Sequence, residues 1–204
     1  MFTDLQNKLK TFRDLDYETQ QSLLKEIHSR ASSQKEVFQD YLSKVNYGIF
    51  SHREIFYEAI WNYPQGWEDF FHAELAQLIG KAENGNKDAV DSLSAMIYLT
   101  YLEDMNAEFY TKSVEFLTQK LRSKIPEVRE NCAQAITDIH AEYEVELSTN
   151  QIIELQKLLK DSAFKVRVNA YANLKDANLI PKKFSISLID KIRARLFGYS
   201  SLLK

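Results

Sequence analysis

The sequence predicts an all-α protein of about eleven helices, and three observations carry this prediction. Apolar residues recur at the spacing of one helix face through almost the whole chain. Only five Gly and three Pro occur in 204 residues, too few for the frequent turns of a β-sandwich. The glycines also form neither a dinucleotide-binding nor a P-loop pattern. We therefore expect helices joined by short turns.

The expected helices follow one another with little chain between them. Asp16 is the expected N-cap of the second helix, and Ser148 and Thr149 precede the apolar residues of the ninth, which begin at Ile152. Ser51 with Glu54 has the spacing of a capping box. The expected ranges are 3–13, 17–30, 33–47, 51–62, 67–83, 87–101, 108–123, 126–140, 149–160, 163–175 and 185–196.

A period of 38 residues runs through the middle of the chain. It separates Val90, Val128 and Val166. The same period relates small residues four positions later, larger side chains eight positions later, and apolar residues eleven and fourteen positions earlier. These columns are Ser94, Cys132 and Ala170; Tyr98, Ile136 and Leu174; Ile79, Leu117 and Leu155; and Ala76, Val114 and Ile152. The period indicates stacked helical hairpins, since one amphipathic hairpin cannot bury its apolar face alone.

The hairpins are expected to form one continuous unit, because no linker is long enough to separate domains. We predict a single domain over 1–204. Its repeats are clearest over 67–175, and its helices are less regular over 1–66.

Two strings resemble the second helix of a HEAT repeat. One is Pro-Glu-Val-Arg at 126–129, and the other is the run at 161–167, which ends in Val-Arg after an acidic turn. The likeness extends over about 108–175 and weakens at 87–101, where Asp91 replaces the arginine. The resemblance to the HEAT and armadillo-like family implies a right-handed α-solenoid with inner and outer helix layers. It also implies a structural contact between repeats for Arg167, but it implies no activity.

No residue pattern predicts catalysis. Cys132 occupies the small-residue column, where a buried thiol is inert. The four histidines lack metal-ligand spacing, and the serines lack a nucleophile-elbow pattern. We expect no enzyme, no metal and no cofactor, although an enzyme site assembled from scattered side chains stays open.

The location of the protein is expected to be cytoplasmic. A single cysteine suits a reducing compartment. The sequence also lacks an apolar run of about 18 residues and a basic-then-apolar leader, so neither a membrane segment nor a secretory signal is expected.

The charge is unevenly distributed along the chain. Residues 1–53 carry eight Lys/Arg and seven Asp/Glu, residues 54–150 carry seven and eighteen, and residues 151–204 carry eleven and four. The near-neutral total of −3 therefore hides an acidic middle and a basic end. Such asymmetry bears on binding partners rather than on fold.

Aromatic residues concentrate within the acidic middle. Phe56, Ile60, Phe70 and Phe71 are expected in the core, whereas aromatic residues near turns and beside acids suit a protein interface. The expected partner-binding residues are Trp61, Tyr63, Trp67, Glu68, Asp69, Tyr98, Tyr101, Glu103 and Asp104. The leading hypothesis is a non-catalytic module that binds a basic protein there. By analogy of size and charge, an immunity protein that neutralises a toxin is a narrower version.

The basic end supports an alternative in which Lys182, Lys183, Arg193 and Arg195 bind phosphates. DNA-glycosylase-like members of the HEAT-like family hold nucleic acid on a basic surface. The acidic middle would oppose a long duplex along the chain. Nucleic acid is therefore the less favoured partner, and no membrane partner is expected.

Overall fold

The computed structural model describes residues 3–46, 52–62, 66–98 and 105–203. These ranges contain eleven α-helices, short 3-10 helices and no strand. The prediction of an all-α fold of helical hairpins is confirmed. The chain divides into two compact units, Met1–Asp104 and Met105–Lys204, so one domain over 1–204 stays a prediction.

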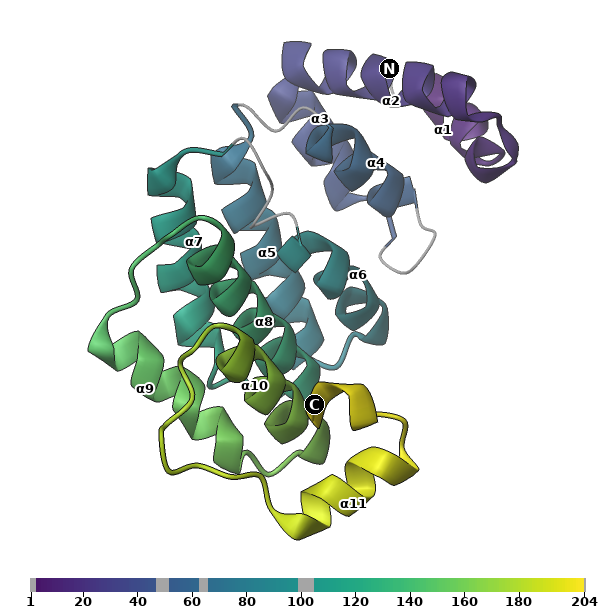
Figure 1. Cartoon of the computed structure of the whole chain (residues 1–204). Coiled ribbons are helices and arrows are strands. Elements are labelled where there is room, and N and C mark those ends of the chain that lie inside the picture. The colour runs from purple at the N-terminus through teal and green to yellow at the C-terminus, as the bar shows by residue number, and fades with distance from the viewer. Residues whose placement is uncertain (1–2, 47–51, 63–65, 99–104, 204) are drawn as a thin grey trace. The chain divides into compact units, whose positions relative to one another are not determined.

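The N-terminal unit contains the first six helices (Figure 1). They are α1 (Thr3–Leu9), α2 (Tyr17–Ser33), α3 (Lys35–Ser43), α4 (His52–Trp61), α5 (Glu68–Glu83) and α6 (Lys87–Tyr98). The expected first helix ends early, because the chain tightens into the 3-10 turn η1 (Phe12–Asp14). Asp16 caps α2 as expected, since its side chain accepts a 3.0 Å hydrogen bond from the Thr19 amide. The expected Ser51 capping box lies outside the described residues.

The core of the N-terminal unit is built on aromatic rings. Phe38 meets the rings of Phe56 and Trp67 edge-on, with centroids 5.4 and 5.5 Å apart, and Phe70 lies 5.3 Å from Trp67. Rings at these distances add attraction to the area that they bury. The prediction that Phe56, Ile60, Phe70 and Phe71 fill the core is confirmed, since none is more than 5% exposed.

A buried polar network joins three helices of the same unit. Arg53, on α4, is fully buried and donates hydrogen bonds to the Glu74 carboxylate on α5 and to the Leu42 carbonyl near the end of α3. The Tyr57 hydroxyl donates a 2.5 Å bond to the same carboxylate. The charge of Arg53 is thus compensated inside the core, as a buried ion requires.

The C-terminal unit contains two successive hairpins and a terminal helix. Its elements are α7 (Ala107–Lys120), α8 (Pro126–Glu142), α9 (Thr149–Lys157), η3 (Leu158–Lys160), α10 (Phe164–Asp176), α11 (Leu188–Leu196) and η4 (Ser200–Leu203). α8 packs against both α7 and α10, so the second hairpin stacks on the first (Figure 1). The Ser148 side chain caps α9, and Gln151 completes a capping box.

The residues that the 38-residue period aligns in this unit are buried, except Ile152, which is half-buried. Val128 and Val166 are 0% exposed, and the small residues Cys132 and Ala170 are 0% and 3% exposed. The predicted burial of Cys132 is confirmed. Small side chains at these positions suit the close packing of α8 and α10. The third copy, on α5 and α6, is looser: Val90 is half-buried and Ala76 is exposed.

A repeated arginine–aspartate contact fixes one repeat to the next. Arg129 donates two hydrogen bonds, both 2.7 Å long, to Asp161, and Arg167 donates bonds of 2.6 and 3.0 Å to Asp190. Each arginine also bonds a backbone carbonyl, of Ser123 or of Asp161. The structural contact that the HEAT resemblance implies for Arg167 is confirmed. We call these two pairs the arginine ladder.

Candidate functional site

Trp67 is the one expected partner-binding aromatic residue whose side chain the structure describes. It is 2% exposed and packs against Phe38 and Phe70. The Lys35 ammonium lies 4.8 Å from its ring centroid, a cation–π contact. Trp67 therefore belongs to the core of the N-terminal unit rather than to its surface, because Lys35 and the neighbouring rings cover it.

Of the other eight expected partner-binding residues, the structure describes the side chain of Asp69 alone. Asp69 is exposed on α5. Tyr63, Tyr101, Glu103 and Asp104, and the side chains of Trp61, Glu68 and Tyr98, lie outside the described residues. The described surface thus contains Asp69 alone of the nine residues.

The expected phosphate-binding residues are all exposed in the C-terminal unit. Lys182 and Lys183 precede α11, and Arg193 and Arg195 lie on it. Arg167 is nearby in sequence but is held by Asp190 in the arginine ladder. These four cations thus lie on α11 and on the segment that connects α10 to it.

A groove with an apolar floor and a lysine rim lies beside this connection. It has a volume of about 420 Å³ and lies between α9 with η3 and the segment 181–184. We call its apolar lining residues the floor (Ile153, Leu159, Pro181 and Phe184) and its lysines the rim (Lys157, Lys160 and Lys183). We call it the lysine groove. The two sides of the lysine groove are separated by about 20 residues of chain, so no local sequence pattern predicts it.

Hydrogen bonds hold both sides of the lysine groove in place. Gln156 donates a 2.8 Å bond to the Leu179 carbonyl and so ties the outer segment to α9. Lys157 donates a 2.6 Å bond to Glu154, which also accepts from Arg122. These bonds lower the pKa of Glu154 to about 2. Ile153 remains 44% exposed at the floor, so an apolar partner group would displace water there.

An exposed apolar stripe runs along α11. Its members are Leu188 (72% exposed), Ile189 (64%), Ile192 (49%) and Leu196 (75%). We call these four residues the α11 stripe. The opposite side of the helix is buried at Asp190 and Ala194. Large apolar side chains clustered at such exposure indicate an interaction surface.

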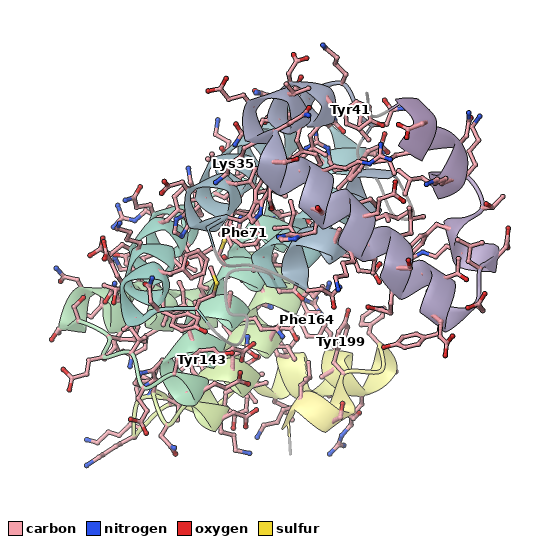
Figure 2. The ribbon with its side chains drawn as sticks, turned by 90° about the horizontal axis from the view of Figure 1, so that it is seen from above. Lys35, Tyr41, Phe71, Tyr143, Phe164 and Tyr199 are labelled. Atoms are coloured by element: carbon pink, nitrogen blue, oxygen red, sulfur yellow. The ribbon has the colours of Figure 1, made fainter. Side chains whose placement is uncertain are left out.

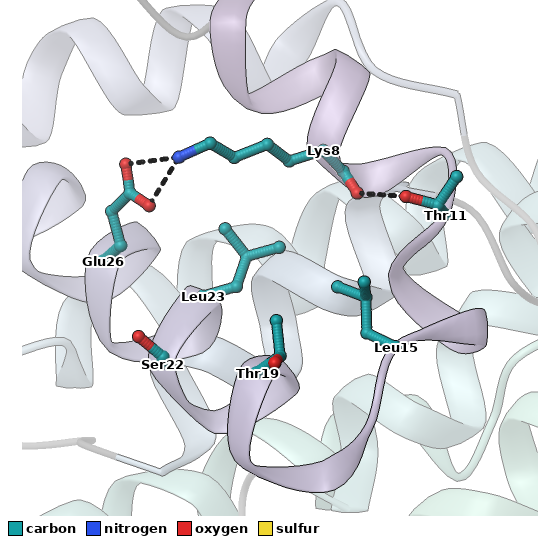
Figure 3. A pocket seen from close by; sticks show the side chains of 7 residues that line it. All are labelled: Lys8, Thr11, Leu15, Thr19, Ser22, Leu23 and Glu26. Atoms are coloured by element: carbon teal, nitrogen blue, oxygen red, sulfur yellow. Dashed lines mark hydrogen bonds and ion pairs between the residues drawn. The ribbon is translucent and has the colours of Figure 1, made fainter.

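A smaller pocket lies in the N-terminal unit (Figure 3). Its volume is about 320 Å³, and its polar lining includes Thr11, Thr19 and Ser22. Lys8 and Glu26 form an ion pair across it, with a shorter N–O distance of 2.9 Å. The pair neutralises the two charges, which leaves little electrostatic attraction for a ligand.

Two carboxyl groups on α8 have raised pKa values. Burial, with a smaller contribution from the nearby charge of Glu142, raises the pKa of Asp138 to about 6. Burial also raises the pKa of Glu130, which accepts a 2.6 Å hydrogen bond from Asn169 of α10. Within the described ranges no group of three or more His, Cys, Asp or Glu residues is placed to hold a metal ion.

Residues 95–198, just over half of the chain, match the family described as non-SMC mitotic condensation complex subunit 1 (Cnd1). The chain belongs to this family. Cnd1 is a HEAT-repeat-type helical family, in agreement with the stacked hairpins and the arginine ladder. The match covers almost the whole C-terminal unit, including the lysine groove and the α11 stripe.

The other comparisons add no relative. No curated protein and no solved structure matches the chain significantly. In the part of the chain that the structure describes, no helix has the length and apolar character needed to cross a membrane.

Proposed function

We propose that the chain is a non-catalytic repeat scaffold that binds a protein partner through the C-terminal unit. The lysine groove carries this proposal, since it joins a partly exposed apolar floor to a cationic rim. Such a surface suits a protein segment with an apolar anchor between carboxylates. The family description supports a scaffold role, because it names a subunit of a complex.

The proposed partner has an acidic surface. The sequence had instead led us to expect a basic partner, bound by the acidic, aromatic middle of this chain. That expectation placed Trp67 at the interface, but its side chain is covered by the N-terminal core. The lysines of the groove rim and the cations of α11, in contrast, are exposed and lie beside apolar side chains. The narrower idea of a toxin-neutralising inhibitor receives no support from the comparisons, and the proposal does not include it.

Nucleic acid is the second candidate partner. The exposure of Lys182, Lys183, Arg193 and Arg195 favours it, because phosphates bind to such cations. The apolar floor of the lysine groove favours protein, because a phosphate backbone has no apolar group to place there. Nuclease treatment distinguishes the two candidate partners, because it degrades a nucleic acid and leaves a protein intact.

Affinity capture from cells tests the proposal. The tagged chain is compared with a K157E/K160E/K183E variant, each in extracts with and without nuclease treatment. Retained proteins are quantified by mass spectrometry. We expect an acidic protein to be retained by the wild-type chain and reduced about tenfold or more by the variant, because the rim changes sign.

The matched control is K10E/K25E/K44E, which makes the same change of charge at exposed positions of the N-terminal unit. We expect it to retain the partner as the wild-type chain does. Equal loss in both triple variants would contradict the lysine groove as the site. Retention that disappears entirely with nuclease would replace the protein partner with nucleic acid.

A further inference from the structure

We propose that the α11 stripe docks an amphipathic helix with acidic flanks from a protein partner. This inference rests on the proposed function, since it adds a second contact to the same scaffold. Its starting point is the four large apolar side chains of α11 that are 49% to 75% exposed. Removing apolar area of this kind from water favours association with a partner.

The stripe has the shape of a helix-packing surface. At 3.6 residues per turn, Leu188, Ile192, Leu196 and Ile189 fall within about 100° of the helix circumference. That width is typical of the apolar face by which an amphipathic helix packs on another. The four residues thus form one continuous strip along the helix and not scattered exposed positions.

The opposite side of α11 anchors the helix to the repeat. Asp190 is 6% exposed and accepts both hydrogen bonds of Arg167, and Ala194 is fully buried. Hydrogen bonds from Arg167 lower the pKa of Asp190, so this carboxylate stays charged and paired near neutral pH. The anchoring face and the stripe point in different directions, which presents the stripe outward.

Both ends of α11 are also fixed. The Ser187 hydroxyl accepts a 3.0 Å bond from the Asp190 amide and so caps the helix start. After the helix, Gly198 turns the chain at φ +82°, a conformation that favours glycine. Tyr199 then reaches Phe164 of α10, with ring centroids 6.0 Å apart (Figure 2). A helix that is already formed loses less entropy when a partner binds.

Exposed cations flank the stripe on both edges. Lys191 and Arg195 precede it around the helix circumference, and Arg193 follows it. Cations beside an apolar seam select a partner helix with carboxylates beside its own seam, as in coiled coils. The charge on both edges therefore specifies an acidic occupant.

The same arrangement disfavours other occupants. Two copies of α11 packed through their stripes would bring cations against cations, which is destabilising. A nucleic acid duplex presents its phosphates outward and has no continuous apolar strip of the width of the stripe. The stripe is aliphatic and lacks the Trp and Tyr that anchor interfacial helices at lipid headgroups. A protein helix meets both the apolar and the charge requirement.

The test measures binding of a synthetic helical peptide to the full chain by fluorescence anisotropy. The peptide carries Leu and Ile at i, i+3, i+4 and i+7, with Glu on both edges. A second peptide has Lys in place of each Glu, and a third has the first composition in scrambled order. The chain is tested as wild type, as I189S/I192S, and as the control Y17S/V37S, which removes two apolar side chains exposed in the N-terminal unit.

We expect the acidic peptide to bind the wild-type chain and Y17S/V37S equally, and I189S/I192S at least about tenfold more weakly. The Lys peptide should also bind about tenfold more weakly or worse, because its charges face the cations. The substituted positions are exposed, and far-UV circular dichroism and the melting temperature show whether each variant keeps its fold.

Each of the following results would overturn the inference. The scrambled peptide binds equally well, or I189S/I192S binds like the wild type. Phosphatidylserine vesicles or a duplex oligonucleotide bind through the stripe and displace the peptide. The wild-type chain is a dimer that I189S/I192S dissociates. In the capture experiment, a partner lost from the lysine-groove variant but kept by I189S/I192S would remove this inference and leave the proposed function intact.

Discussion

The two units of the chain are stabilised by different means. In the N-terminal unit, aromatic rings form much of the core, and Arg53 and Glu74 are buried there as an ion pair. In the C-terminal unit, smaller side chains repeat with the period, and the arginine ladder joins successive repeats near the surface. The aromatic core with its buried ion pair does not repeat along the chain, whereas the arginine–aspartate contact recurs from one repeat to the next.

The difference in construction accompanies a difference in charge. The N-terminal unit carries 10 Lys/Arg and 17 Asp/Glu, and the C-terminal unit carries 16 and 12. The C-terminal unit also exposes the lysine groove and the α11 stripe. Each repeat packs only against its neighbours, so one surface of the stack stays exposed. Cations and apolar side chains on that surface are available to bind a partner.

The largest expected effect comes from breaking the buried pair of the N-terminal unit. Arg53→Met leaves the Glu74 carboxylate buried without its cation, which should lower the free energy of unfolding by about 3–5 kcal/mol. Denaturant unfolding followed by tryptophan fluorescence measures it, since both tryptophans lie in this unit. The exposed-pair control Arg13→Met should change stability by less than about 1 kcal/mol. Equal effects would show that the buried network contributes nothing particular.

The next effect comes from the arginine ladder of the C-terminal unit. Arg129→Met removes two charged hydrogen bonds from Asp161, both residues being about one-tenth exposed, and should cost about 2–3 kcal/mol. Far-UV circular dichroism during denaturation measures this loss, with Asp161→Asn and the double variant completing a cycle. Additive losses in the double variant would contradict a direct coupling.

A smaller effect of opposite sign is expected at Asp138. Its pKa is raised to about 6 from an ordinary 3.8, so the folded state holds a proton that the unfolded state releases between these values. The free energy of unfolding therefore falls as pH rises from about 4 to 6. After allowance for solvent screening, Asp138→Asn should stabilise the protein at pH 7 by about 1 kcal/mol and have little effect below about pH 4.

Thermal melts at pH 4 and pH 7 measure the effect of Asp138→Asn. The control is Glu115→Gln, an exposed carboxylate on α7. Stabilisation that is the same at both pH values would contradict a role for the titration of Asp138.

The smallest effect concerns the surface pair of Arg122 and Glu154 beside the lysine groove. Arg122→Gln removes hydrogen bonds of 2.8 and 3.1 Å, and the pKa of Glu154 should rise from about 2 toward 4.5. Carbon-13 NMR titration of the carboxyl group measures this rise. Any stability from the pair exists above pH 4.5 and is lost as pH falls toward the lowered pKa of Glu154. A pKa that stays near 2 in the variant would exclude Arg122 as its cause.

Local sequence patterns predicted the parts of the fold that depend on nearby residues. The period placed Val128 and Cys132 in the core because each repeat packs in the same way. Asp16 and Ser148 were predictable as caps because their partners lie three residues away. The partners of Arg129 and Arg167 were harder to predict, since Asp190 lies in α11 and does not continue the 38-residue spacing from Asp161.

The candidate site was predicted only in part, because exposure depends on contacts between distant segments. The sequence around Trp67 is compatible with either a surface anchor or a core residue. Only the structure shows that Lys35 and Phe38 cover it and place it in the core. The periodicity of 185–196 predicted a helix but gave no indication of which apolar face stays open. The lysine groove required the segment 181–184 to lie against α9, which no sequence spacing specifies.

Hydrogen–deuterium exchange of the full chain, alone and with its captured protein partner, tests whether the C-terminal unit forms the binding surface. We expect slower exchange on binding in residues 153–160 and 181–197, which contain the lysine groove and the α11 stripe. Protection there should weaken with added salt. Protection confined to residues 54–98, with none in the C-terminal unit, would contradict binding through the C-terminal unit.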